Sequence, residues 1–343
     1  MVEPRVFSVE PWAVAERELH LDLLPGTESI FALSNGHIGL RGNLDEGEPH
    51  GVPGTYLNGF FETMPLPYAE SGYGYPEEGQ SLIDVTNGKL FRLLVDDSAF
   101  DVRYGAVDRH ERVLDLRDGV LRRDVRWTTP TGKAVGIRSV RLVSFVHRAV
   151  VAIRYEVEAL EAPVRIVVQS SLVANEPVPE RERDPRAAAA LRDPLLGEYH
   201  AHRDLEVGLG HRTRGSGLRL AAALDHFVEG PEHTTTAAES EPDLARVTVS
   251  TELEPGQRLA VVKLLGYGWS SRRSMPALRD QVDAALAAAK HVGWEGLLAA
   301  QRAYLDDVWD RADVELEGDP ELQQAVRFAI FQVVQAAARA EGT

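Results

Sequence analysis

Apolar and polar side chains alternate through most of the chain, from about residue 85 to residue 270. Such a period of two places successive side chains on opposite faces of a β-strand. One run has Leu121, Arg123, Val125 and Trp127 at every second position. The segment Pro130-Thr131-Gly132 is typical of a turn, and the alternation resumes at Val135 and Ile137. We therefore expect a long antiparallel hairpin here.

The same alternation predicts strands along the rest of this region. Val151, Ile153, Tyr155 and Val157 share one face, and further runs are Val164–Val173, Leu218–Leu224, Arg246–Leu253 and Arg258–Gly266. Helical patterns do not interrupt them regularly, which argues against a doubly wound parallel sheet. We expect about a dozen strands in stacked antiparallel sheets, a mainly β protein built as a large sandwich. Two polar segments interrupt the pattern: Glu176–Asp193 is expected to be an excursion or short helix on the rim, and Glu229–Asp243 an exposed loop.

The pattern changes to that of helices after Tyr267. Pro276–Ala289 and Trp294–Asp313 have apolar side chains at helical spacing, and a short link leads to Asp319, a good N-cap before Pro320. We therefore predict three parts: a sandwich over residues 1–268, a helical linker over 269–318, and the first helix of another domain over 319–343.

The last predicted helix carries an unusually wide apolar surface. One stripe of it consists of Leu322, Val326, Ile330, Val333 and Ala337. A helix with so much apolar surface is normally buried by other helices. We expect the chain to be the front part of a larger protein whose remainder holds the chemistry. In this chain alone the helix is expected to fray, or to be covered by a second copy.

Composition excludes several classes of function. The net charge of -16 argues against nucleic acid or an anionic membrane as a partner. No apolar run approaches the length of a membrane-spanning helix, so we expect no membrane segment. The absence of cysteine excludes disulfides, thiolate nucleophiles and cysteine-ligated metals. The first residues lack the features of a signal peptide, and we expect a cytoplasmic protein.

The most unusual local sequence is Phe31–Glu46, which has glycines at 36, 39 and 42. This spacing lacks the strand-then-helix context of a dinucleotide loop and the Gly-Lys-Ser/Thr end of a P-loop. One interpretation is a glycine-kinked strand packed closely against another element. The other is a site-lining role for Asn35, Arg41 or Glu46.

The next segment, Gly51–Pro76, is rich in glycine, proline and aromatic residues, including Tyr56. Aromatic faces stack on the C–H surfaces of sugars, so such a loop suits a carbohydrate site. It could equally be an ordered loop with its own small core.

Histidines and paired carboxylates provide weaker signals. His200 and His202 would point the same way on a strand, with His211 nearby, but no carboxylate stands at firm ligand spacing, so we expect no metal. Three acidic pairs could in principle serve acid–base chemistry, but neighbours on a strand face opposite ways, and solvated faces or caps are the simpler interpretation. These pairs are Asp45-Glu46, Asp96-Asp97 and Asp306-Asp307.

Several of these segments together carry a family resemblance. Phe31–Glu46 followed by Gly54–Phe61 resembles the N-terminal domain of glycoside hydrolase family 65, the group of maltose, trehalose and kojibiose phosphorylases and related hydrolases. Ala303–Trp309 looks like the linker helix of that family, and Leu322–Gln332 like its first barrel helix.

The resemblance implies a galactose mutarotase-like β-supersandwich, linker helices and then an (α/α)6 barrel, of which only the first helix is present. It also implies an inverting enzyme acting on α-linked glucose disaccharides, with inorganic phosphate as co-substrate in a phosphorylase, no cofactor, and a homodimer. The general acid of the family lies in the barrel, so no catalytic residue is carried over. The residues expected to contribute to substrate binding are Asn35, Arg41, Glu46 and Tyr56.

Two other functions remain open at this stage. One is a stand-alone carbohydrate-binding or dimerisation module. The other is a mutarotase-like epimerase, which would need a catalytic His and Glu pair on the concave sheet. The candidate histidines are His200, His202, His211 and His226.

Overall fold

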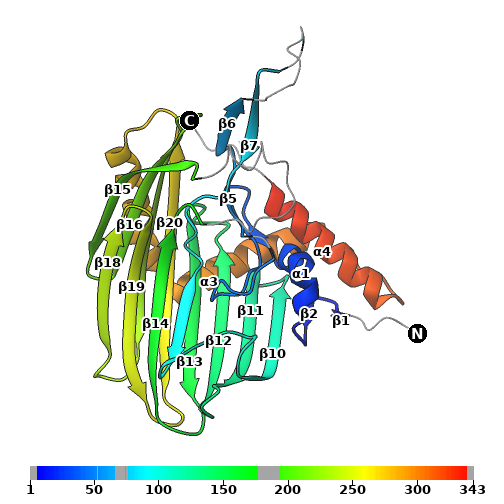
Figure 1. The fold of residues 1–343 in the computed structure, drawn as a ribbon. Coiled ribbons are helices and arrows are strands. Elements are labelled where there is room, and N and C mark those ends of the chain that lie inside the picture. The colour runs from blue at the N-terminus through cyan, green and yellow to red at the C-terminus, as the bar shows by residue number, and fades with distance from the viewer. Residues whose placement is uncertain (1–5, 52, 66–73, 75, 177–192, 338–343) are drawn as a thin grey trace.

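A ten-stranded antiparallel sheet dominates the computed structural model, which describes residues 6–51, 53–65, 74, 76–176 and 193–337 (Figure 1). We refer to its two faces as inner, toward the second sheet, and outer. Its strands, in spatial order, are β1 (Phe7–Glu10), β2 (Ala13–Glu16), β10 (Ala106–Asp115), β11 (Val120–Thr128), β12 (Ala134–Val143), β13 (Val150–Ala159), β20 (Arg258–Ser270), β17 (Arg219–Glu229), β16 (Glu206–Thr213) and β15 (Leu195–Arg203).

A five-stranded antiparallel sheet faces the inner side of the larger one (Figure 1). It consists of β18 (Thr235–Glu241), β19 (Leu244–Leu253), β14 (Val164–Val173), β8 (Phe91–Val95) and β9 (Ser98–Ala99). A small sheet is formed by β3 (Leu33–Ser34), β4 (Ile38–Leu40) and β5 (Thr55–Leu57), and a projecting hairpin by β6 (Phe61–Pro65) and β7 (Glu78–Leu82). The short helices η1 (Leu21–Leu23) and α1 (Leu24–Ile30) precede β3. The expectation of a mainly β, antiparallel sandwich is therefore confirmed.

The predicted hairpin is β11 and β12, with Trp127 opposite Val135 in the register. Its turn is closed by bonds from the Thr129 amide to the Lys133 carbonyl (2.8 Å) and from the Gly132 amide back to Thr129 (2.9 Å). Gly132 has φ of 86°, a conformation that glycine adopts without steric cost. Alternation and turn chemistry thus agree, which fixes which side chains reach the inner face.

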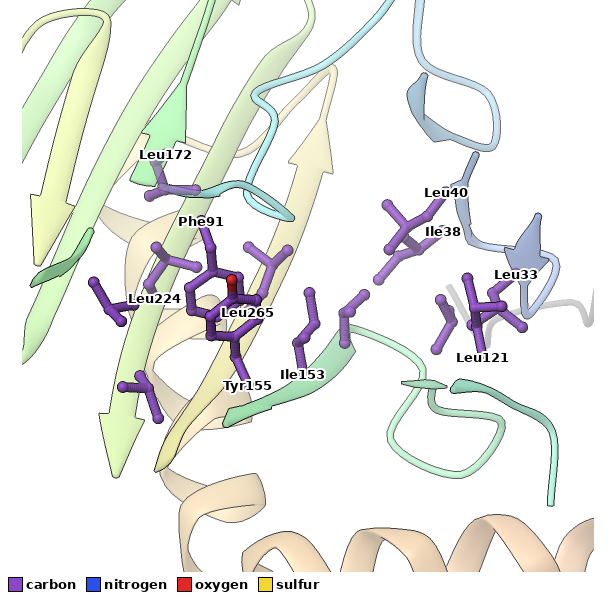
Figure 2. Packing of buried hydrophobic residues seen from close by; sticks show 14 of the residues in the cluster. Leu33, Ile38, Leu40, Phe91, Leu121, Ile153, Tyr155, Leu172, Leu224 and Leu265 are labelled. Carbon is purple, nitrogen blue, oxygen red and sulfur yellow. The ribbon is translucent and has the colours of Figure 1, made fainter. Parts of the chain in front are cut away.

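The main core lies between the two sheets and extends under β3 and β4 (Figure 2). Phe91 of the smaller sheet stacks on Tyr155 of the larger one, with ring centroids 4.7 Å apart. Ile38 and Leu40 bring the small sheet into the same cluster as Leu121 (Figure 2). Full burial of each aliphatic or aromatic side chain contributes about 1.5–3 kcal/mol relative to exposure.

A long helix, α3 (Met275–Ala312), covers part of the outer face, as Figure 1 shows. Gly293 interrupts it with φ of 72° and ψ of 172°, which confirms the prediction of two consecutive helices. Gly266 and Gly268 lie beneath it, and a Cβ on either would come within 3.0 Å of Val282. The missing side chains let the helix approach the sheet closely.

The last described helix, α4 (Pro320–Ala336), begins as expected: the Asp319 side chain accepts a bond from the Leu322 amide at 2.9 Å. Its apolar stripe, which we expected other helices to bury, faces away from the sandwich in this chain. Leu322 is 50% exposed and Val333 70% exposed. The buried face instead consists of Gln323, Arg327, Phe331 and Gln335.

This mostly polar face is buried because of the surface on which α4 lies. It packs against β1, β2 and β3 of its own sandwich, where backbone carbonyls at sheet edges need donors. Gln324 Nε2 donates to the carbonyls of Ser8 (2.9 Å) and Ala13 (2.6 Å). Arg327 stacks 3.7 Å from the Trp12 ring centroid. The expectation of a frayed helix, or one buried only by a second copy, is therefore wrong for residues 320–336.

One other prediction is revised. The predicted loop Glu229–Asp243 contains β18, an edge strand. Its exposed, polar side chains resemble those of a loop because edge strands commonly carry such residues. The predicted rim excursion lies mostly outside the described residues, which resume at 193. Among the described residues, no helix has the length and apolar character needed to cross a membrane.

Candidate functional site

The Phe31–Glu46 segment folds inward onto the larger sheet. After β3, a turn at Gly36 (φ of 78°) leads into β4, and residues 41–44 then run without regular structure. A Cβ on Gly42 would lie 2.5 Å from the Phe31 Cβ. Close packing of a glycine against another element, one of the two interpretations of this segment, is therefore observed at Gly42.

Asn35 is buried and uses its side-chain amide to hold this turn. Its Nδ2 donates to the carbonyls of Ser144 (2.6 Å) and Arg148 (2.9 Å). Its Oδ1 accepts from the amides of His37 (3.0 Å) and Ile38 (2.9 Å). All of these bonds tie the turn together and to the neighbouring β12–β13 connection.

Arg41 and Tyr56 lie on the adjoining small sheet and its flank. Arg41 donates to the Pro25 carbonyl (2.8 Å) and lies 3.6 Å from the Glu28 carboxylate. Its stem passes so close to Gly54 that a Cβ there would be 2.3 Å from the Arg41 Cδ. Tyr56 is half-buried on β5. A role of Asn35, Arg41, Glu46 and Tyr56 in substrate binding stays a prediction.

Glu46 belongs to a buried ionic cluster on the inner face, which we define as Asp45, Glu46, Arg123, Arg141 and Tyr155. Arg141 donates to Asp45 at 2.5 Å. Arg123 and the Tyr155 hydroxyl donate to Glu46 at 2.7 and 2.6 Å. The interpretation of the Asp45-Glu46 pair as a solvated face is therefore wrong. Because this part of the chain is irregular rather than a strand, both neighbouring carboxylates can turn toward the same sheet.

The protonation states of Asp45 and Tyr155 in the ionic cluster are set by burial and by the neighbouring charged groups. Burial alone would raise the pKa of Asp45, but Arg141 and Arg123 outweigh it and lower that pKa below its usual value. Burial, and next the Glu46 carboxylate, raise the pKa of Tyr155 well above its usual range. Asp45 therefore stays ionised and Tyr155 stays a neutral donor at neutral pH. This arrangement clamps the segment to the sheet.

Two lysines lie beside the ionic cluster, and among the residues that the structure describes their ammonium groups bond to carbonyl and hydroxyl oxygens rather than to carboxylates. Lys263 Nζ donates to the carbonyls of Gly88 (2.8 Å) and Leu90 (2.6 Å) and lies 4.0 Å from the Phe91 ring centroid. Lys89 Nζ donates to the Thr55 hydroxyl at 3.1 Å. Burial lowers the pKa of Lys263 well below its usual range and that of Lys89 to about 8. Sequence reasoning missed both, although the alternation of β20 places Lys263 on the inner face.

The candidate histidines divide into an exposed and a buried pair. His200 and His202 point the same way on β15, as predicted, and their Nδ1 atoms lie 3.3 and 3.1 Å from the Ser240 hydroxyl. His211 is buried and bonded to Asp243 (3.0 Å), and His226 is buried against Ser170 (2.7 Å).

These positions bear on the metal and epimerase alternatives. Within the described ranges, no group of three or more His, Asp or Glu side chains is placed to hold a metal. His211 and His226 are at most 2% exposed, whereas His200 and His202 are exposed. A sugar could not reach His211 or His226, so the geometry does not favour an epimerase that uses either of them.

An open cavity lies on the outer face, away from the predicted binding residues. It has a volume of about 260 Å³ and lies between the start of α3 and strands β15, β16 and β17. Its polar lining includes Tyr199, Arg203, Glu206, Arg279 and Asp283. Sequence reasoning missed this cavity because its lining comes from four separate segments.

The described fold is a large antiparallel sandwich followed by two consecutive helices and a further helix. The model of the glycosyl hydrolase family 65 N-terminal domain matches residues 14–308. The chain therefore belongs to glycosyl hydrolase family 65, of which it contains the N-terminal domain, as the resemblance implied.

Similar proteins support this assignment. An uncharacterized glycosyl hydrolase from Mycobacterium tuberculosis is 60% identical over 99% of this chain and 43% of its own length. An α,α-trehalose phosphorylase from Thermoanaerobacter brockii is 30% identical over 97% of this chain and 44% of its own length. The solved structure of a putative kojibiose phosphorylase from human microbiome matches with a TM-score of 0.86 at 20% identity, over 96% of this chain and 42% of that one. The chain thus spans less than half the length of these proteins.

Proposed function

We propose that this chain is the N-terminal sandwich and linker of a family 65 enzyme that cleaves α-linked glucose disaccharides by phosphorolysis or hydrolysis. The observation that carries the proposal is the similarity to a trehalose phosphorylase along almost the whole chain. Trehalose, maltose and kojibiose are the candidate substrates, and inorganic phosphate is the co-substrate of the phosphorolytic form. A cytoplasmic location remains part of the proposal.

The proposed chemistry is an inversion at the anomeric carbon. A protonated carboxylic acid in the barrel gives its proton to the glycosidic oxygen, and the bond from this oxygen to the anomeric carbon breaks. A phosphate oxygen attacks the anomeric carbon from the opposite face, which yields β-glucose 1-phosphate and a free sugar. In the hydrolytic form, a carboxylate base activates water in place of phosphate. No residue of this chain is assigned a catalytic role in either form.

In this proposal the sandwich supports the barrel through α4, which would be the first barrel helix. The polar face of α4 is fixed to the sandwich: Arg327 donates to Asp313 at 2.7 Å, and the Ser34 amide donates to Gln335 Oε1 at 2.6 Å. Its opposite face, with Leu322 and Val333, remains exposed. An apolar face on an anchored helix suits packing against further helices.

The test is phosphate-dependent release of glucose 1-phosphate from trehalose, maltose, kojibiose and nigerose, with release of glucose without phosphate measured in parallel. We expect no turnover by the 343-residue chain and turnover by the full-length protein in one of the two assays. Clear turnover by the 343-residue chain would contradict the proposal, because the acid would then lie within it.

A second function, that of a carbohydrate-binding or dimerisation module, is favoured by one observation, the exposed apolar face of α4. Such a face promotes association in water. Sedimentation velocity over a range of concentrations would test it, with Val333→Glu as the variant. A dimer that this change dissociates would support the module. A homodimer unaffected by it would use another surface.

A further inference from the structure

The outer-face cavity owes its shape to where α3 crosses the sheet. The helix packs on β17, β20 and β13, and its first residue, Met275, lies against Gly210 of β16. Another part of the outer side of β15 and β16 stays uncovered beside its first turns. The floor of the cavity is built from small residues, including Ala201, Gly208, Ala221 and Ala223. A Cβ on Gly208 would meet only ordinary contacts, the nearest being Tyr199 Cε1 at 3.5 Å. Since short side chains cannot fill the space beside the helix, the hollow remains open.

An aromatic side chain forms one wall of this hollow. The Tyr199 side chain leans over the β16 glycines: a Cβ on Gly210 would lie 3.1 Å from the Tyr199 Cβ. The guanidinium of Arg279, from the second turn of α3, lies 5.5 Å from the ring centroid. Tyr199 therefore packs among Gly208, Gly210 and Arg279 and provides a rigid, partly apolar wall.

The charged groups of the cavity balance one another. Arg203 is bonded to Glu206 at 2.9 Å, and Arg279 lies 3.9 Å from Asp283. Two cations thus accompany two carboxylates. Burial, and next the Glu206 carboxylate, raise the pKa of Asp283, so an incoming hydroxyl donor would relieve an unfavourable environment. A phosphate group would need an excess of positive charge here, and a metal ion an excess of negative charge.

We propose that this cavity binds a neutral polyhydroxyl compound of monosaccharide size, such as a hexose. Each hydroxyl both donates and accepts, so it can use carboxylates and guanidinium groups without requiring net charge. The volume of about 260 Å³ lies just below the range of roughly 300–1,000 Å³ typical of sites for larger organic ligands. This site is independent of the proposed function, because it lies entirely within the described chain.

The experiment is a titration of the 343-residue chain with D-glucose, in which saturation-transfer-difference NMR measures binding. We expect saturable binding that Glu206→Gln and Asp283→Asn each weaken by about tenfold, because each variant removes the charge from an acceptor. Glu239→Gln is the matched control: Glu239 lies in another surface ion pair, with Arg246, and this variant should bind as the unchanged chain does.

A second pair of variants tests the site by volume rather than charge. Ala201→Leu should fill the floor and abolish binding, whereas Ala237→Leu, on exposed β18, should not change it. Unchanged thermal melting of both variants would show that they are folded. Absence of glucose binding by the unchanged chain, or unchanged binding by Ala201→Leu, would overturn the proposal. So would a marked preference for glucose 1-phosphate over glucose, since it would indicate an anion site.

Discussion

The two faces of the ten-stranded sheet are covered by different kinds of side chain. On the inner face, buried arginines, carboxylates and lysines lie among the apolar side chains, and the arginines hold the Phe31–Glu46 segment in place. On the outer face, the cluster beneath α3 is almost entirely aliphatic. Buried charges require particular partners, whereas aliphatic packing tolerates rearrangement. The inner face should therefore tolerate fewer substitutions than the outer face.

The largest expected effect comes from breaking the ionic cluster. Asp45→Ala would leave Arg141 and Arg123 buried beside a missing charge, and we expect a loss of about 3–5 kcal/mol in the free energy of unfolding. Urea denaturation monitored by tryptophan fluorescence measures it. The control is Glu161→Ala, which removes an exposed pair with Arg126 and should cost no more than about 1 kcal/mol. Equal losses in the free energy of unfolding would show that the buried and the exposed ion pairs do not differ in their contribution to stability.

A comparable change on the outer face is Leu278→Ala. Leu278 is fully buried under α3, and truncation should cost about 2–5 kcal/mol through lost contacts and a cavity. The same denaturation assay applies. Leu278→Met, which nearly conserves volume, should cost less than about 1.5 kcal/mol. If Leu278→Met proved as damaging as Leu278→Ala, the outer face would be as exacting as the inner one.

Acidification should selectively weaken the inner face. Burial lowers the pKa of His226 to about 4, against about 6.5 in an unfolded chain. Because the unfolded state then binds the proton more readily, the stabilisation is present above about pH 6.5 and is lost as the pH falls toward 4.

From His226 alone we expect a loss of about 2 kcal/mol between pH 7 and pH 5. Denaturation at pH 7 and at pH 5, for the unchanged chain and for His226→Gln, separates the contribution of His226 to the loss of stability from the contributions of the other buried histidines. An identical pH dependence in the two chains would show that His226 does not contribute.

The smallest expected difference concerns the two faces of α4. Arg327→Ala removes the pair with Asp313 and the contact with Trp12, and amide hydrogen exchange along α4 should become markedly faster. Val333→Ser changes an exposed position and should shift the free energy of unfolding by no more than about 0.5 kcal/mol. Faster exchange in the Val333 variant than in the Arg327 variant would contradict the anchoring of α4 through its polar face.

The sequence predicted the strands well because alternation is a local property. Val164–Val173 was expected as a strand and is β14, and the turn near Gly132 was correctly placed. An exposed edge strand such as β18 carries little of this signal, since one of its sides packs weakly and its residues are polar. The helical break near Gly293 was also local, because glycine there adopts a conformation that other residues avoid.

The candidate site was less accessible to sequence reasoning. Phe31–Glu46 was identified as unusual, but its charged residues could be assigned to the ionic cluster only once β11, β12 and β13 lay beside it. The lining of the outer-face cavity comes from segments far apart in the chain, so no local pattern indicates it.

By itself, the sequence determined the elements of this protein: antiparallel strands from alternation, helices from apolar spacing, and their ends from Asp319, Gly132 and Gly293. The tertiary structure alone decided which side of each element is buried wherever polar groups compete for partners. In α4 the buried side includes Gln323, Arg327 and Gln335 rather than the apolar stripe, because the neighbouring backbone carbonyls and Asp313 required donors. Periodicity reports the water-avoiding side of an isolated element, whereas the position of a hydrogen-bonding partner is set by chain segments that only the fold brings together.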